Sequence, residues 1–296
     1  MVERPWFVNT IGGWARDIVQ LLWGNVPTND DYFLDLNERV LREVGFPCVI
    51  FAKSDYGVVA IDCNDCDTYE VDDQQISIYI KLQFRPGHAY KTKAYPFSYV
   101  PQNVRGFLEK RHELRRIYSQ TPKEYRAWGR FIAVSLDRFH LAHAMHKLGL
   151  AGGCYVTCEQ GYEDHALDPV KGRERMTFEE YLTHLYRASA VIDARGFGDL
   201  THRTVEVLGI GAPLIRPKLE DQTIDPLISG VHYLDCGHEG EKLADCLEII
   251  ENHRMRQALI GNGLDWFENN CTDAALRARY SQVVDLALEK RVASNL

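Results

Sequence analysis

The chain lacks several features that would decide its class at once. It has no apolar run near the roughly 20 residues of a membrane span, and its first residues lack the pattern of a signal peptide. Basic residues do not predominate: 34 Lys and Arg against 42 Asp and Glu give a formal net charge of −8, which argues against a surface that grips nucleic acid throughout. We therefore expect a globular, cytoplasmic protein without a membrane span.

A zinc-binding pattern is also missing. Of the eight cysteines, Cys63 and Cys66 form a lone C-x-x-C with no second pair at zinc spacing. We expect reduced loop or core thiols, with a metal or redox role as the alternative. His140, His143 and His146 recur at three-residue intervals without an accompanying carboxylate or cysteine, so packing and surface roles are favoured and no metal site is predicted.

Neither repeats nor low-complexity linkers interrupt the 296 residues, a length that favours two domains. Short apolar runs alternate with longer helical ones, which predicts an α/β fold. Strands are expected at 47–52, 58–62, 76–84, 131–135, 154–158, 190–194, 212–216 and 231–234. Helices are expected at 33–44, 107–118, 138–148, 178–187, 241–251, 253–261 and 274–292, with one more between 194 and 212. We place an N-terminal acceptor-side lobe at 1–125, a C-terminal nucleotide-binding lobe at 126–273, and a last helix in 274–296 that packs back on the first lobe.

The most informative stretch is SAVIDARGFGDLTHRTVEVLGIGAPLIRP, residues 189–217. It predicts a strand, a glycine turn at Gly196 and Gly198, a helix capped by Asp199 or Thr201, and a second strand. In an open α/β sheet, ligands lie at the carboxyl ends of strands beside helix N-termini, whose partial positive charge suits phosphate. The pattern therefore predicts a phosphate-binding site.

Two basic residues begin this predicted helix. His202 and Arg203 stand where the helix dipole disfavours a cation, which makes sense if an anion docks there. Arg203 and Glu206 are three residues apart and share a face, so an ordinary surface ion pair is the alternative. Arg195 and Lys218 are further candidates for phosphate contact, although Lys218 also suits a solvated position.

The segment resembles the donor-binding half of GT-B glycosyltransferases and is most similar to their exostosin-like and spore-maturation-type members. The residues that match the signature are Gly196, Gly198, Thr201, Arg203, Glu206, Gly211 and the strand at 212–215. The resemblance implies an α/β fold of two Rossmann-like lobes, with a reduced N-terminal lobe. It also implies an enzyme that moves a hexosyl or pentosyl group from a UDP- or GDP-sugar to a glycan or small-molecule acceptor. In such an enzyme Arg203 would meet the donor diphosphate and Glu206 the ribose hydroxyls, without a cofactor or a catalytic metal.

The resemblance extends upstream to residues 60–84. There an Asp-rich strand end supplies Asp62 and Asp65 as candidate bases for the acceptor hydroxyl, with turn capping in the D-C-N-D-C-D run as the alternative. Lys81 and Arg85 are candidates for phosphate or acceptor contact, and Lys81 suits a solvated strand face equally well.

One departure bears on the mechanism. Many GT-B enzymes carry two glutamates eight residues apart, whereas Gly198 stands eight residues before Glu206. Retention and inversion of the sugar therefore both stay open. Two rival hypotheses remain: a glycosyltransferase that acts on modified bases in DNA, against which the acidic charge argues, and a non-catalytic module that binds nucleotide-sugars.

Overall fold

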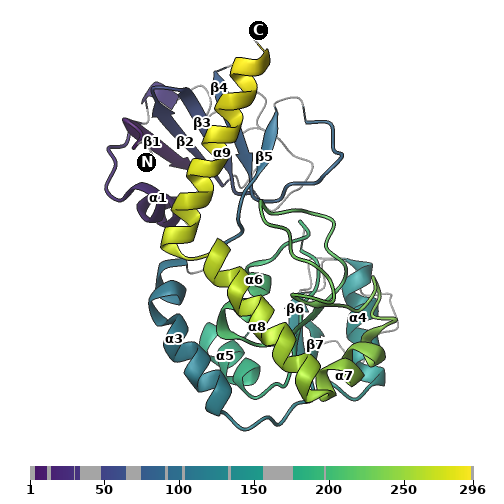
Figure 1. Ribbon diagram of the computed structural model, residues 1–296. Coiled ribbons are helices and arrows are strands. Elements are labelled where there is room, and N and C mark those ends of the chain that lie inside the picture. The colour runs from purple at the N-terminus through teal and green to yellow at the C-terminus, as the bar shows by residue number, and fades with distance from the viewer. Residues whose placement is uncertain are drawn as a thin grey trace.

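The computed structural model describes residues 4–11, 15–29, 31–33, 48–64, 75–90, 93–101, 104–132, 135–155, 176–196 and 198–294. Figure 1 shows two lobes, each built on its own sheet, with the C-terminal helices running from one lobe to the other. The predicted α/β class with two lobes is confirmed, because each of the two five-stranded sheets is covered by helices. The helix expected at 33–44 falls almost wholly outside the described residues.

The N-terminal sheet is mixed. Its strands are β1 (Phe7–Ile11), β2 (Val49–Ser54), β3 (Gly57–Asp62), β4 (Ile76–Lys81) and β5 (Ala94–Pro96), which lie side by side in this order. β1 to β3 pair antiparallel, whereas β3 to β5 pair parallel. The tight turn into β3 needs glycine, because Gly57 has a φ of 108° and a Cβ there would meet the Ser77 hydroxyl. Helix α1 (Ala15–Trp23) and the short η1 (Asp31–Phe33) complete the described part of this lobe.

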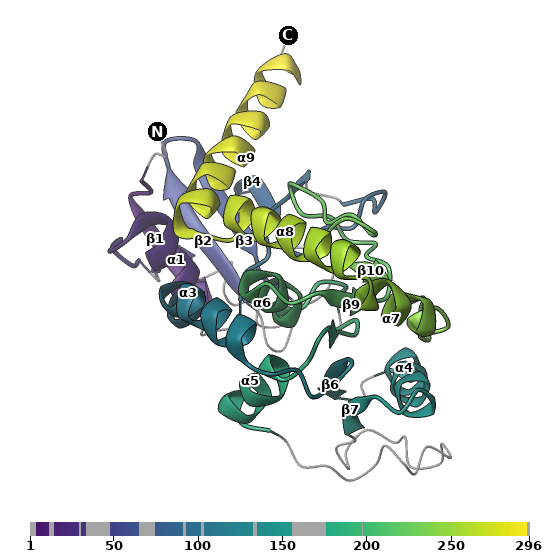
Figure 2. The ribbon, with the colours of Figure 1, turned by 60° about the horizontal axis from the view of Figure 1, so that its bottom comes forward.

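The C-terminal sheet is parallel throughout. Its strands are β6 (Trp128–Ile132), β7 (Ala151–Tyr155), β8 (Val191–Ile192), β9 (Leu214–Arg216) and β10 (Leu234–Asp235), in the order β10-β9-β8-β6-β7. The helices are α3 (Val104–Gln120), α4 (Leu136–Lys147), α5 (Phe178–Tyr186), α6 (His202–Ile210), α7 (Leu243–Glu251) and α8 (His253–Asn270). Helices α3, α5, α6 and α8 cover one face, and α4 and α7 cover the other (Figure 2). Apolar strands buried on both faces are typical of a doubly wound sheet.

The last two helices connect the lobes. α8 continues past Gly261, where the sequence predicted an end, because this glycine keeps a helical backbone and the following turns bury Trp266 and Phe267. α9 (Asp273–Ser294) then packs on α1, where Tyr280 meets the Trp23 ring at 5.1 Å between centroids. Both lobes consequently share one continuous apolar core.

Candidate functional site

The strand order places a candidate site at the carboxyl edge of the C-terminal sheet. From β6 the chain passes to β7 on one side and later returns to β8 on the other, so the connections diverge between β6 and β8. Ligands of open α/β sheets bind in the crevice at such a point. The residues that follow β8, 193–201, are called the β8 loop below; residue 197 is not among those described.

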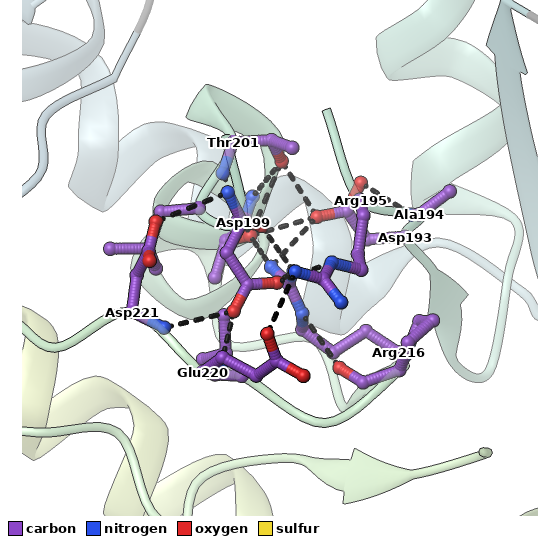
Figure 3. Close-up of polar contacts among 12 residues, drawn as sticks. Asp193, Ala194, Arg195, Asp199, Thr201, Arg216, Glu220 and Asp221 are labelled. Atoms are coloured by element: carbon purple, nitrogen blue, oxygen red, sulfur yellow. Dashed lines mark hydrogen bonds and ion pairs between the residues drawn. The ribbon is translucent and has the colours of Figure 1, made fainter. Parts of the chain in front are cut away.

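The β8 loop is fastened to the start of α6. Thr201 caps the helix: its hydroxyl accepts a hydrogen bond from Thr204 N, and the Thr201 N–H points back to the Thr204 hydroxyl. Both hydroxyls donate to one carboxylate oxygen of Asp193, at 2.6 and 2.8 Å (Figure 3). Gly211 ends the helix with a φ of 76°. The predicted strand and capped helix are confirmed, with Thr201 rather than Asp199 as the cap.

Arg216 is a residue of the site that the sequence prediction missed. At the end of β9 its guanidinium is wholly buried between two buried carboxylates, 3.4 Å from Asp193 and 3.6 Å from Asp199. It also donates to the Thr204 hydroxyl and the Asp199 carbonyl. The signal was present in the sequence, since Asp193 and Arg216 each directly follow an apolar strand segment. These contacts hold the β8 loop from its buried side.

Arg195 lies at the open side of the same network. Its Nε is 3.0 Å from Asp199 Oδ1, and its Nη2 is 3.3 Å from Glu220 Oε2 (Figure 3). Glu220 also meets Arg85 of the N-terminal lobe at 3.2 Å. Arg85, a predicted phosphate or acceptor contact, therefore reaches the edge of the candidate site. Lys218, which like Glu220 lies in the loop after β9, is exposed.

Arg203 occupies the first turn of α6. Its guanidinium lies over the Tyr181 ring of α5, 5.1 Å from the centroid, and 3.9 Å from Asp193. Burial alone would lower the pKa of Arg203, but Tyr181, Asp193 and Glu206 together raise that pKa above its ordinary value. The group thus stays charged although its side chain is only 24% exposed. Glu206, one turn further along α6, is buried beside it, so the simple surface ion pair is wrong.

Arg138 is a second residue that the sequence prediction did not single out. It stands in the first turn of α4, whose N-cap Ser135 makes no side-chain capping bond. Its Nε donates to the Arg195 carbonyl, and its NH2 group lies 3.8 Å from where a Cβ on Gly196 would be. A basic residue soon after the first strand of a Rossmann unit was the available signal. Arg138 and Arg203 thereby each contact the β8 loop, which itself carries Arg195.

His202 faces the other lobe. Its Nδ1 lies 2.8 Å from the carbonyl oxygen of Val100, and because a carbonyl only accepts, Nδ1 carries the hydrogen. Its ring lies 5.3 Å from that of Tyr99. This predicted donor-binding residue therefore also joins the start of α6 to the N-terminal lobe.

Asp62 and Lys81 lie elsewhere than predicted. Both are 0% exposed, and the Lys81 amine is 2.9 Å from the Asp62 carboxylate, which also accepts hydrogen bonds from Tyr79 and Asn64. The solvated strand face, one of the two alternatives for Lys81, is therefore wrong. The turn-capping alternative holds for Asp62, because Asn64 N donates to it at 2.8 Å. Asp62 is thus a buried partner of Lys81, Tyr79 and Asn64, and Asp65 lies outside the described residues.

No metal centre is found among the residues that the structure describes, where no group of three or more His, Cys, Asp and Glu side chains could hold an ion. His140 instead pairs with Glu239 at 2.9 Å, and Cys63 is a buried free thiol. Cys66 is outside the described residues. Over the same residues, no helix combines the length and apolarity needed to cross a membrane.

Comparison with known protein families gives no match, and comparison with curated proteins gives none either. Among solved structures, HepE from Anabaena in complex with UDP has a TM-score of 0.49 at 13% identity, over 73% of this chain and 65% of that one. TarM has a TM-score of 0.47 at 9% identity, over 73% and 48%. A glycosyltransferase from Rickettsia africae has a TM-score of 0.45 at 10% identity, over 71% and 63%. The chain thus spans between about half and two thirds of the length of these proteins, and the likeness does not identify its ligand.

Proposed function

We propose that this chain is a metal-independent GT-B glycosyltransferase that takes a sugar from a UDP- or GDP-sugar. One observation carries the proposal. Arg138 from the start of α4 and Arg203 from the start of α6 both contact the β8 loop, at the carboxyl edge of a parallel sheet where its connections diverge. The N-termini of α4 and α6, each with an arginine in its first turn, therefore direct positive charge at the β8 loop.

This arrangement suits the leaving group of sugar transfer. As the bond from the anomeric carbon to the diphosphate oxygen breaks, negative charge builds on the diphosphate and positive charge on the sugar ring. Arg138, Arg195 and Arg203 would neutralise the diphosphate, and Gly196 would let it approach the backbone of the loop closely. The acceptor hydroxyl then forms the new bond to the anomeric carbon, its proton passes to the departing diphosphate or to solvent, and the nucleoside diphosphate leaves as the second product.

The second part of the proposal concerns the nucleoside. Glu206 lies on the same side of α6 as Arg203, one turn further from the helix start. A carboxylate suits two vicinal ribose hydroxyls, as it does in dinucleotide-binding folds. We assign Glu206 to the ribose, and the glycan or small-molecule acceptor to the side of the site that the N-terminal lobe faces.

The test measures binding of UDP and GDP, and of the free nucleosides, by calorimetry. Arg203→Met and Arg138→Met should each weaken diphosphate binding about 10- to 100-fold while nucleoside binding changes little, because each loses charge-assisted hydrogen bonds to phosphate worth about 1.5–3 kcal/mol. Arg116→Met is the matched control, because Arg116 is exposed on α3 and bonds Gln120 of the same helix.

Two results would overturn parts of the proposal. If neither diphosphate nor any UDP- or GDP-sugar binds the wild-type chain, the assigned site is wrong. If they bind, but no donor sugar is hydrolysed or transferred with a panel of glycan and small-molecule acceptors, the chain is a nucleotide-sugar-binding module and not an enzyme. Equal activity with and without a chelator is expected for the metal-independent reaction.

A further inference from the structure

A short segment that leaves β4 crosses to the C-terminal lobe and contacts the β8 loop. Its central residue, Gln83, is 0% exposed and lies 117 residues before its partner, Leu200. The Gln83 amide nitrogen donates to the Leu200 carbonyl at 2.7 Å, and the Leu200 N–H donates to the Gln83 amide oxygen at 3.0 Å. One side-chain amide therefore satisfies both main-chain groups of a buried loop residue, as a neighbouring strand would.

The fit around this amide leaves no spare room. A Cβ built on Gly198 would lie 2.5 Å from the amide carbon (Cδ) of Gln83, which is closer than Cβ atoms come to other heavy atoms in real proteins. A larger side chain at position 198 would therefore take the place of the Gln83 amide and require that amide to move. Glycine at this position serves the approach of Gln83, in addition to the turn that the sequence predicted.

The neighbours of Gln83 contact the next loop as well. Gln222 N donates to the Phe84 carbonyl at 2.7 Å, and Arg85 pairs with Glu220 at 3.2 Å. Three consecutive residues of the N-terminal lobe thus bind the loops that follow β8 and β9. These are the loops that carry the candidate donor site.

We propose that Gln83 is a positioning residue for the donor, a role that rests on the proposed function. Leu200 directly precedes the cap Thr201, so a shift of Leu200 moves the start of α6 together with Arg203. The hydrogen bonds of Gln83 described above go to Leu200 and not to Thr201 or Arg203. Gln83 therefore acts on Thr201 and Arg203 through the Leu200 backbone. Donor affinity thereby depends on a side chain of the opposite lobe.

The test uses UDP as the probe and two variants of one size. Gln83→Met keeps the volume but makes neither hydrogen bond, and we expect it to raise the dissociation constant for UDP about tenfold, measured at least 15 °C below its melting temperature. Gln222→Met is the matched control and should bind as the wild type does, because Gln222 is exposed and meets Phe84 only through its backbone N–H.

Gln83→Glu adds a readout that a purely structural role would not move. A neutral carboxyl can donate to the Leu200 carbonyl and accept from its N–H, as the amide does, whereas the charged form cannot donate. Burial raises the pKa of such a carboxyl. The affinity of Gln83→Glu relative to the wild type should therefore improve as the pH falls from about 9 to about 6.5.

The outcomes separate the two proposals. If Gln83→Met and Gln83→Glu melt at lower temperature but bind UDP as tightly as the wild type at every pH, Gln83 is structural only and this inference is wrong, while the proposed function stands. If the wild type binds no nucleotide diphosphate, the proposed function fails and this inference fails with it.

Discussion

Replacing Gly198 with alanine adds one methyl group where the β8 loop faces Gln83 of the N-terminal lobe. The new Cβ would lie 2.5, 2.7 and 2.8 Å from the three terminal heavy atoms of the Gln83 amide. Because Gln83 is fully buried and held by two hydrogen bonds to Leu200, its amide cannot move away without breaking both.

The magnitude follows from these contacts. Loss of the amide leaves the Leu200 N–H and C=O buried without partners, at a cost of about 1–3 kcal/mol for each group. If the amide instead stays and the loop is compressed, overpacking costs about 1–3 kcal/mol. Because the chain adopts the cheaper of these two responses, we expect Gly198→Ala to lower the free energy of unfolding by about 1–3 kcal/mol.

Urea unfolding of four chains measures this effect: wild type, Gly198→Ala, Gln83→Ala and the double variant. Alanine at position 83 leaves room for the methyl group, so Gly198→Ala should cost at least about 1 kcal/mol less in that background. Gly261→Ala is the control, because no atom lies within 4 Å of its Cβ and alanine in a helix interior stabilises by about 0.5–1 kcal/mol. A loss below about 0.5 kcal/mol for Gly198→Ala, or equal losses in both backgrounds, would refute the reasoning.

Two further predictions concern charge. Lys81→Met leaves the Asp62 carboxylate buried without its cation and should cost about 3–5 kcal/mol in urea unfolding, whereas adding Asp62→Asn should restore most of the loss; no recovery in the double variant would contradict the pairing. Burial lowers the pKa of His232, whose Nδ1 accepts a hydrogen bond from Ile228 N at 2.9 Å. The His232 imidazole therefore binds a proton more readily in the unfolded chain than in the folded one. The stability that neutral His232 contributes is present above the unfolded pKa of about 6.5 and is lost as the pH falls below it. His232→Gln should flatten the dependence of the urea midpoint on pH between about 7 and 5, and an unchanged dependence would argue against it.

The parts of the site that could be predicted from the sequence depend on local interactions. Thr201 caps α6 through a residue three positions away, and Gly211 ends it through a backbone conformation that glycine adopts readily. Such signals lie within one or two helical turns, so a single sequence contains them. At Gly261 the predicted helix end is wrong, because the burial of Trp266 and Phe267 extends α8 past this glycine.

The remaining parts depend on contacts between distant segments. Gln83 meets a residue 117 positions away, and Arg138 meets a carbonyl 57 positions away. Lys81 interrupts a run of apolar residues, and the sequence predicts either a phosphate or acceptor contact or a solvated strand face for it, yet Asp62 on the adjacent strand pairs with it inside the lobe. No property of these residues alone shows which partner the fold brings to them.

The charged groups around the β8 loop divide into two sets by exposure. Arg216, Asp193 and Asp199 are at most 2% exposed, whereas the side chains of Arg195 and Arg203 are 21% and 24% exposed. Burying three ionised groups carries a desolvation cost that an apolar core would avoid, so stability alone does not account for the inner set. Because the buried guanidinium bonds the loop carbonyl and the α6 hydroxyl together, it fixes the loop with a geometry that apolar packing would not specify. Arg195 extends from that fixed loop and Arg203 from the first turn of the helix that follows it, and both side chains are still partly exposed. A diphosphate would need this arrangement in order to bind them without first reordering the loop.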